Sequence, residues 1–157
     1  ETARGLGATV VGLDEIYDVE CDVFSPNALG AIVNDATIPR IKAKIIAGAA
    51  NNQLAETRHA DVLRERGILY APDYVINAGG IINVSVEFHP GGYDEKVSLG
   101  KIERIPQALK ELWTISKEER IPTSDAADRL AERILADARG QKKAQAATPS
   151  PRGRSGC

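Results

Sequence analysis

The chain has 157 residues, 43% of them hydrophobic and 27% charged, so it is long enough to bury a single globular core. Its net charge of −2, with both signs interspersed, gives no reason to expect binding to nucleic acid or to an anionic membrane. Cys21 and Cys157 are too few for a disulfide framework, and no apolar run reaches the roughly 18 residues that cross a bilayer. We therefore expect a cytoplasmic protein without a membrane segment.

Four short apolar runs of strand length punctuate the first half of the chain. They span residues 8–11, 22–24, 44–47 and 68–70. Between them the spacing predicts a short helix over 27–34, a short turn over 38–42 and a clearer helix over 58–66. Strands that alternate with helices are typical of βα units around a parallel sheet. The pattern therefore predicts an α/β fold with about four parallel strands.

The second half of the chain changes to helical spacing. Helices are predicted over 74–84, 96–117 and 124–139. The adjacent Gly79 and Gly80 interrupt the first of these, so the helix bends there or something approaches its backbone closely. In the last helix, five apolar residues are expected to pack inward: Ala127, Leu130, Ala131, Ile134 and Leu135. The predicted domain covers 1–139, and the aperiodic segment 140–157 is expected to be a disordered tail.

Residues that usually carry metal or nucleophile chemistry are sparse. The chain lacks a Gly-x-Gly-x-x-Gly turn, a Walker-type loop and a paired-cysteine motif, so no short signature marks a complete nucleotide or metal site. His59 and His89 are both interpreted as surface histidines. Cys21 has no histidine near it in sequence and is interpreted as a buried structural residue. The sequence therefore predicts no metal site.

Small and amide residues gather in three segments, 25–30, 48–53 and 77–83. Each is expected just beyond the carboxyl end of a strand, where open α/β sheets bind ligands. Small residues let a flat ring approach the backbone, and asparagine offers both a donor and an acceptor. Any one segment alone could be a strand-to-helix turn with capping residues. Three at the same edge of one sheet favour a binding cleft.

The runs CDVFSPNALG (21–30), GAANNQL (48–54) and YAPDYVINAGGIINV (70–84) resemble the Glu/Leu/Phe/Val dehydrogenase family. Within it the chain looks most like the C-terminal portion of leucine and valine dehydrogenases, from about residue 7 to residue 139. The resemblance implies a partial Rossmann-like parallel sheet followed by C-terminal helices. It also implies NAD-dependent oxidative deamination of a branched-chain L-amino acid to a 2-oxo acid and ammonia, in a two-domain homo-oligomer.

The resemblance assigns the cofactor contacts residue by residue. Ala28 and Leu29 match positions that lie along the cofactor, and Ala49, Ala50 and Asn51 match positions at its nicotinamide end. Asn51 would orient the nicotinamide carboxamide or the substrate carboxylate. The choice of NAD over NADP rests on the resemblance alone.

Ile81 and Val84 match positions that form the apolar pocket for the substrate side chain. Their spacing of three residues places both on one helical face, as the periodicity independently predicts. An aliphatic pair suits leucine, valine or isoleucine. Without the resemblance, simple core packing would be the favoured interpretation of both residues.

The chain departs from the family pattern in what it lacks. The family's catalytic lysine and phosphate-binding glycine turn would precede Glu1, and no lysine here has a matching context. Hydride transfer needs cofactor and substrate held face to face, and proton removal needs a positioned base, so we expect no catalytic residue in this chain and no activity from it alone. It is interpreted as part of a longer enzyme. The alternatives are a non-catalytic Rossmann-derived module for oligomerisation or binding, and a generic nucleotide-binding half.

Overall fold

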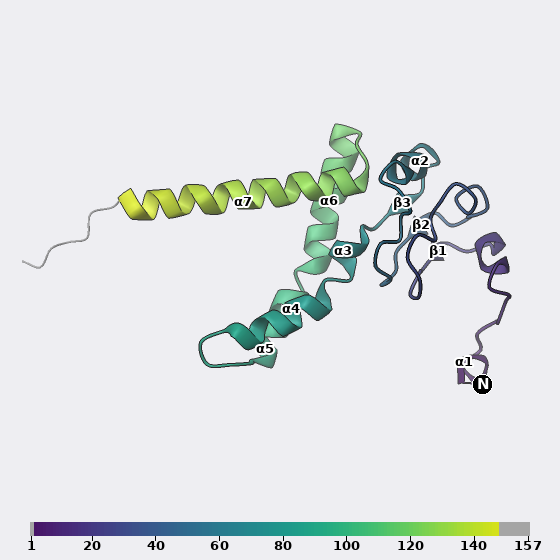
Figure 1. The fold of residues 1–157 in the computed structure, drawn as a ribbon, viewed down its shortest axis with the longest axis horizontal. Coiled ribbons are helices and arrows are strands. Elements are labelled where there is room, and N and C mark those ends of the chain that lie inside the picture. Colours follow the sequence, from purple (N-terminus) through teal and green to yellow (C-terminus); the bar gives the residue numbers. More distant parts are fainter. Residues whose placement is uncertain (1, 148–157) are drawn as a thin grey trace, which may run out of the picture.

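The computed structural model describes residues 2–147 and the side chains of residues 2–141. Its centre is a parallel sheet in the order β1-β2-β3, formed by Val23–Phe24, Ile45–Ile46 and Leu69–Tyr70 (Figure 1). Val23 pairs with Ile45, which pairs with Leu69. Three of the four predicted strands and their parallel arrangement are confirmed. Among residues 2–147, no helix is long and apolar enough to cross a membrane.

The prediction of a strand over 8–11 is wrong. These residues form no strand and follow the short helix α1 (Thr2–Gly5), and the next element is the 3-10 helix η1 (Glu15–Asp18). A strand needs a neighbour to pair with, and no described strand lies beside this run. The segment is tied to the body further on, where Arg40 forms ion pairs with Asp14 and Asp18 at 2.9 and 2.7 Å.

The prediction of a helix over 27–34 is also wrong, because residues 31–33 lie beside residues 52–55 and hydrogen-bond to them. The N–H groups of Ala31 and Val33 donate to the carbonyls of Asn52 and Gln53 at 2.7 and 2.9 Å. Hydrogen bonding to a neighbouring segment replaces the bonds that a helix would make within itself. The predicted helix over 58–66 is confirmed as α2 (His59–Glu65).

The C-terminal half is helical but more divided than predicted. Its elements are α3 (Asp73–Ile76), α4 (Gly79–Ser85), η2 (Val86–Phe88), α5 (Glu95–Ile102), α6 (Ile105–Glu119) and α7 (Thr123–Ala147). The helix predicted over 74–84 is interrupted at Asn77–Ala78, and the glycine pair begins α4 rather than bending it. The single helix expected over 96–117 is two, because Pro106 lacks an N–H and suits the first turn of a new helix.

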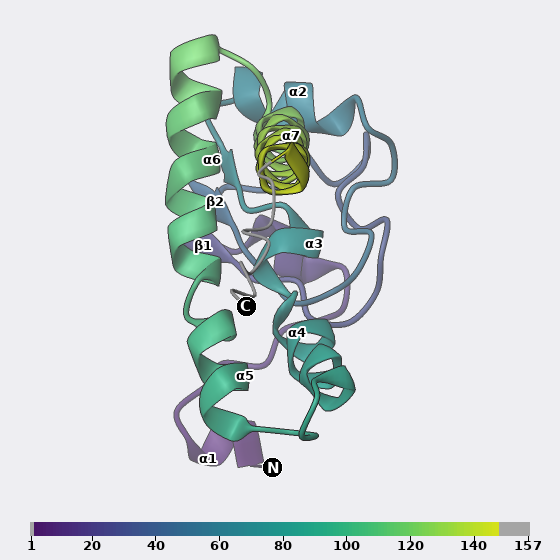
Figure 2. The same cartoon turned by 90° about the vertical axis from the view of Figure 1, so that its left-hand side faces the viewer.

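Helix α7 extends further than the sequence indicates. It continues to Ala147, so Arg139 does not end it, and residues 148–157 of the expected disordered tail lie outside the described residues. Ala127 and Leu130 pack inward as expected, but Ile134 and Leu135 are 60% and 56% exposed and Ala131 is exposed too. The helix leaves the body after its first turns, as Figures 1 and 2 show.

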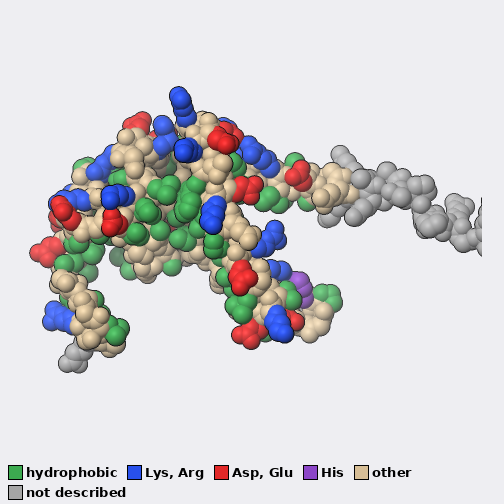
Figure 3. Space-filling model, turned by 180° about the vertical axis from the view of Figure 1, so that it is seen from behind, with side chains coloured by type: hydrophobic (Ala, Val, Ile, Leu, Met, Phe, Trp, Pro, Cys, Tyr) green, Lys and Arg blue, Asp and Glu red, His purple; other side chains and the backbone are tan. Residues whose placement is uncertain are grey.

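Two apolar clusters hold the molecule together. One surrounds the sheet and consists of Val33, Ile38, Ile41, Ala43, Ile46, Leu63, Ile68 and Tyr70. The other joins α6 to the start of α7 and consists of Ala71, Leu109, Leu112, Ile115, Ala126, Ala127 and Leu130. In the space-filling view, hydrophobic side chains also gather on the body between the N-terminal segment and the arm formed by α4 and α5 (Figure 3). The strands' carboxyl ends face the loops described next.

Candidate functional site

The structure brings the three predicted cleft segments together around the backbone of one residue, Ala49. The Ala49 N–H donates to Oδ1 of Asn27 at 2.9 Å, and the Ala49 carbonyl accepts from Nδ2 of Asn77 at 3.3 Å. Asn27 follows β1, Ala49 follows β2, and Asn77 follows α3 beyond β3. Since the strands are parallel, all three segments meet at the carboxyl edge of the sheet, which is where such sheets bind ligands.

Two glycines allow the segments to approach this closely. A Cβ on Gly48 would stand 2.1 Å from the carbonyl oxygen of Pro26, and one on Gly30 would stand 2.8 Å from the carbonyl oxygen of Asn51. Contacts this short are far inside van der Waals range and involve backbone atoms that cannot turn aside. Any larger residue at either position would push the segments apart.

Gln53 and Asp73 support the turn that carries Ala49, Ala50 and Asn51. The fully buried Gln53 donates from Nε2 to the carbonyls of Gly48 and Ala50 at 2.7 and 2.9 Å. Its own N–H donates to Oδ2 of the buried Asp73 at 2.7 Å. The NH2 group of Gln53 and the carboxylate of Asp73 thus hold the backbone of the turn at Gly48, Ala50 and Gln53. The buried Oε1 of Gln53 has no hydrogen-bond partner among the described residues. Sequence reasoning missed both supports, although an amide and a carboxyl inside otherwise small or apolar motifs could have indicated them.

An open hollow of about 660 Å³ lies in front of this turn. Among the predicted site residues, Ala49, Asn51 and Ile81 line it. It is also lined by Asn52, Asn77 and Ala78, which belong to the predicted cleft segments but were given no individual role, and by Asp73 and Tyr74, which sequence reasoning did not assign. A second hollow of about 400 Å³ shares Asn52, Asp73 and Tyr74 with the first. The walls of the larger hollow combine three asparagines and two alanines with Asp73, Tyr74 and the aliphatic side chain of Ile81.

Asn52 has a φ of +52°, in the left-handed region that asparagine adopts more readily than most residues.

Tyr74 donates from its hydroxyl to the Ser124 carbonyl at 3.2 Å, and burial raises the pKa of Tyr74 to about 12. Burial also raises the pKa of Tyr70. Both phenols are therefore neutral at physiological pH and act as hydrogen-bonding groups without charge.

The remaining predicted site residues lie around the hollow rather than in its lining. Ala28 and Leu29 are exposed on the loop after β1, and Ala50 is buried behind the turn, where its N–H donates to the Pro26 carbonyl at 2.9 Å. Val84 lies one turn beyond Ile81 on α4. Ile81 is 71% exposed and Val84 45% exposed, so the core-packing interpretation of this pair is wrong for the described chain.

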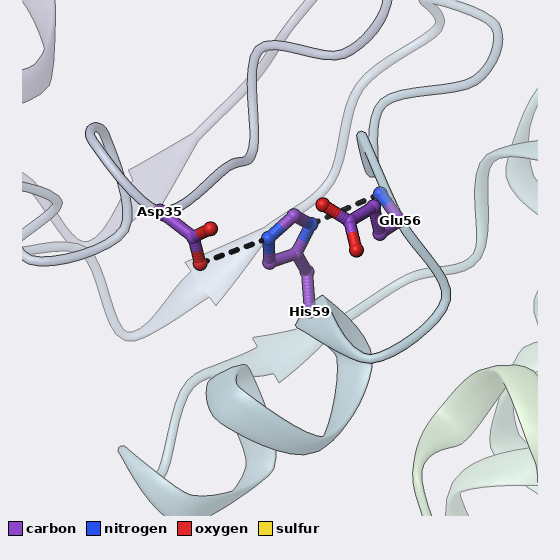
Figure 4. A group of neighbouring side chains, drawn as sticks. All are labelled: Asp35, Glu56 and His59. Atoms are coloured by element: carbon purple, nitrogen blue, oxygen red, sulfur yellow. Dashed lines mark hydrogen bonds and ion pairs between the residues drawn. The ribbon is translucent and has the colours of Figure 1, made fainter.

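His59 is not at the surface, as the sequence suggested, but 1% exposed. Its Nδ1 accepts the Glu56 N–H at 3.0 Å, and its Nε2 lies 3.2 Å from Oδ1 of Asp35 (Figure 4). Since a backbone N–H occupies Nδ1, the ring proton belongs on Nε2, which donates to Asp35. The imidazole thus joins the loop before α2 to the loop that carries Asp35.

Asp35, Glu56 and His59 offer ligand atoms that all lie within 4.8 Å of one another, as a metal site would. The Arg58 guanidinium hydrogen-bonds to both carboxylates of this cluster, with Nη1 2.8 Å from Asp35 and Nε 2.9 Å from Glu56. Hydrogen bonding to Arg58, helped by His59, lowers the pKa of Asp35 to about 2. Both histidine nitrogens are engaged and a cation already neutralises the carboxylates. The cluster of Asp35, Glu56, Arg58 and His59, which we call the latch, therefore joins two loops by hydrogen bonds and ion pairs.

Cys21 is exposed, which contradicts the prediction that it is buried, because it precedes the edge strand β1. His89 is exposed as predicted. Lys42 and Lys44 lie at the amino end of the sheet and pair with Glu20 and Asp22 at 3.5 and 3.0 Å. No lysine of residues 2–141 lines the larger hollow.

The chain is similar to a family of amino acid dehydrogenases. The family described as glutamate/leucine/phenylalanine/valine dehydrogenase matches residues 4–142. Leucine dehydrogenase from Geobacillus stearothermophilus is 55% identical over 126 residues, which cover 80% of this chain and 34% of that enzyme. L-tryptophan dehydrogenase from Nostoc punctiforme is 52% identical over 149 residues, which cover 94% of this chain and 42% of that enzyme.

The crystal structure of L-tryptophan dehydrogenase from Nostoc punctiforme superposes with a TM-score of 0.83 at 48% identity. The superposition covers 87% of this chain and 40% of that one. The chain therefore spans well under half the length of these relatives, between 34% and 42%. The match to the family covers most of the chain at high identity, and it confirms what the three motifs indicated. The chain belongs to the glutamate/leucine/phenylalanine/valine dehydrogenase family.

Proposed function

We propose that this chain is part of a longer enzyme that catalyses the NAD-dependent oxidative deamination of a branched-chain L-amino acid to a 2-oxo acid and ammonia. The observation that carries the proposal is the placement of Ala49, Asn51 and Ile81 around one hollow at the carboxyl edge of the sheet. Family membership supports an amino acid dehydrogenase. The proposal includes a cytoplasmic, homo-oligomeric complete enzyme whose partner is a small amino acid.

The residues fit a flat cofactor ring next to a small substrate. The small, exposed Ala49 leaves space over the turn, Ala50 is buried behind it, and the buried Gln53 holds the turn by hydrogen bonds. Ala28 and Leu29, exposed on the neighbouring loop, would contact the extended part of the cofactor. When bound there, NAD supplies the acceptor for a hydride from the substrate Cα. Asn51 would orient the carboxamide of the cofactor or the carboxylate of the substrate.

Ile81 and Val84 are proposed to contact the substrate side chain. Both are aliphatic and partly exposed on α4, and Ile81 lines the hollow. An apolar pocket distinguishes substrates by only about 1–3 kcal/mol per methylene. The relatives include enzymes named for tryptophan and phenylalanine, so the preference for branched chains rests on these two residues.

Deamination also needs a base to take protons from the substrate amine and from water. Since no lysine of residues 2–141 lines the hollow, we assign this base to a part of the enzyme outside these residues. This assignment keeps the hydride-transfer geometry in the present chain and the proton transfer outside it. It predicts that the chain alone is inactive.

The test is NADH formation with L-leucine, L-valine, L-phenylalanine and L-tryptophan at alkaline pH, using this chain alone and the complete enzyme. We expect activity only in the complete enzyme, with higher kcat/KM for leucine and valine than for the aromatic substrates. Activity in the isolated chain would contradict the assignment of the base. Preference for an aromatic substrate would contradict the role given to Ile81 and Val84.

A further inference from the structure

Asn77 makes a contact that the proposed function does not use. It lies between α3 and α4, and its Nδ2 is 2.6 Å from Oδ1 of Asn51 and 3.3 Å from the carbonyl oxygen of Ala49. All three residues line the same hollow. One side-chain amide thus touches both the backbone and the side chain of the turn proposed to meet the ligands.

The Ala49 carbonyl determines the orientation of the side-chain amides of Asn77 and Asn51. A carbonyl oxygen only accepts hydrogen bonds, so the Asn77 amide must turn its NH2 group toward Ala49. The same NH2 group then faces Asn51, which must present its oxygen in return. The orientation of Asn51 follows from the backbone and does not depend on distinguishing amide nitrogen from oxygen.

We propose that Asn77 is a positioning residue that makes the side chain of Asn51 a hydrogen-bond donor toward the ligand. With its Oδ1 held by Asn77, Asn51 is left with its NH2 group, for which no partner is seen among residues 2–141. That group fits an acceptor oxygen, such as a carboxamide carbonyl or a carboxylate. This inference rests on the proposed function of the cleft.

Asn77 is well placed for this task because its backbone is fixed independently of its side chain. Its N–H donates to the carbonyl of Asp73 at 2.9 Å, where α3 ends. Asp73 is held in turn by the N–H of Gln53 at 2.7 Å. A change in the Asn77 side chain therefore removes the contact with Asn51 while the helix junction keeps its backbone bonds.

The test is a double-mutant cycle in the complete enzyme, made of Asn77→Ala, Asn51→Ala and the double variant. Binding of NADH is followed by fluorescence without turnover, and KM for L-leucine is measured at saturating cofactor. Asn77→Ala is expected to weaken one of the two by about fivefold in the wild-type background, since it frees Asn51 to rotate. In the Asn51→Ala background the same change is expected to alter neither by more than about twofold.

Asn77→Asp sharpens the test because a carboxylate only accepts hydrogen bonds. It would bind the NH2 group of Asn51 and turn the oxygen of Asn51 toward the ligand, so the loss is expected to exceed about tenfold. Gln107→Glu, which makes the same amide-to-acid change on the exposed surface of α6, serves as the matched control and is expected to have little effect. Asn77→Ser is the second variant if Asn77→Ala folds poorly.

The outcomes separate the two possible ligand atoms. Weaker NADH binding in the binary complex identifies the cofactor carboxamide, whereas a raised KM for leucine alone identifies the substrate carboxylate, and either supports the inference. Equal losses in both Asn51 backgrounds, or no loss in an active enzyme, would overturn it. A complete enzyme that forms no NADH with any amino acid and binds no nicotinamide cofactor would instead refute the proposed function itself.

Discussion

The turn after β2 and helix α4 meet at the same hollow, yet they are held in different ways. Gly48, Ala50 and Gln53 in the turn are buried, and hydrogen bonds tie it to Asn27, Asp73 and Asn77. Helix α4 has no buried residue and contributes Ile81 as an exposed side chain. The close backbone contacts restrict which residues the turn can hold, whereas the exposed side chains of α4 can change without disturbing the packing.

The largest effect is expected from Gly48→Ala, which challenges the rigid side of this comparison. The added Cβ would stand 2.1 Å from the Pro26 carbonyl, so the turn and the loop after β1 must separate. We expect the unfolding free energy to fall by about 3 kcal/mol and NADH binding to be lost. Thermal melting and NADH fluorescence of the complete enzyme measure both.

Gly100→Ala provides the matched control for that variant. A Cβ there meets nothing within 4 Å, and the residue lies inside α5. Alanine should raise stability by up to about 1 kcal/mol, because it favours a helix over glycine. If both glycine variants lost NADH binding equally, close backbone packing would not be what holds the turn.

A smaller loss is expected from Gln53→Leu. The change introduces an apolar side chain of similar size and leaves the carbonyls of Gly48 and Ala50 without their donors. We expect a loss of about 2 kcal/mol in unfolding free energy and weaker NADH binding. Gln107→Leu on the surface of α6 should change neither. Full NADH affinity in Gln53→Leu would show that the turn keeps its shape without this support.

On the α4 side of the comparison, Ile81→Ala should alter specificity without altering stability. Because Ile81 is 71% exposed, its truncation should leave the melting temperature unchanged. We expect kcat/KM for leucine to fall about tenfold, with a smaller loss for phenylalanine. The control is Leu99→Ala, an exposed aliphatic residue on α5. A uniform loss for all substrates would mean that Ile81 does not contact the side chain.

The smallest effect concerns acid stability, and it tests the latch behind the turn. The pKa of Asp35 is lowered from 3.8 to about 2, chiefly by Arg58. A carboxyl whose pKa is lower in the folded state adds stability above its unfolded pKa and loses it as pH falls toward the folded pKa. Between about pH 4 and pH 2, wild-type stability should therefore fall more steeply than that of Asp35→Asn.

The exposed Asp61→Asn on α2 is the control for the acid experiment. It should leave the pH dependence close to that of the wild type, measured as the melting temperature across the same range. Identical acid profiles for wild type and Asp35→Asn would show that the contacts of Asp35 with Arg58 and His59 do not stabilise the fold.

Much of the sheet could be predicted because the strands at 23–24, 45–46 and 69–70 are local apolar runs with clear ends. The errors arose where a distant segment decides the local structure. The helix expected over 27–34 does not form because residues of this segment hydrogen-bond to residues 52–55 instead. The strand expected over 8–11 has no described neighbour. Local spacing carries no information about such partners.

The same limit applies to the site. Ala49, Asn51 and Ile81 could be placed at one cleft because each motif follows a strand, but the roles of Gln53, Asp73 and Asn77 depend on contacts across the loops. The buried His59 makes a hydrogen bond with Asp35, which lies 24 residues away in the chain. Periodicity around one residue cannot reveal a hydrogen bond over that separation.

The most direct test is a crystal structure of the complete enzyme with NADH and the 2-oxo acid of leucine. The account predicts the nicotinamide ring over Ala49, an acceptor oxygen against the NH2 group of Asn51, and the isobutyl side chain against Ile81. A cofactor bound elsewhere would contradict the claim that these three segments form one cleft. A donor group turned toward Asn51 would contradict the orientation inferred for its side-chain amide.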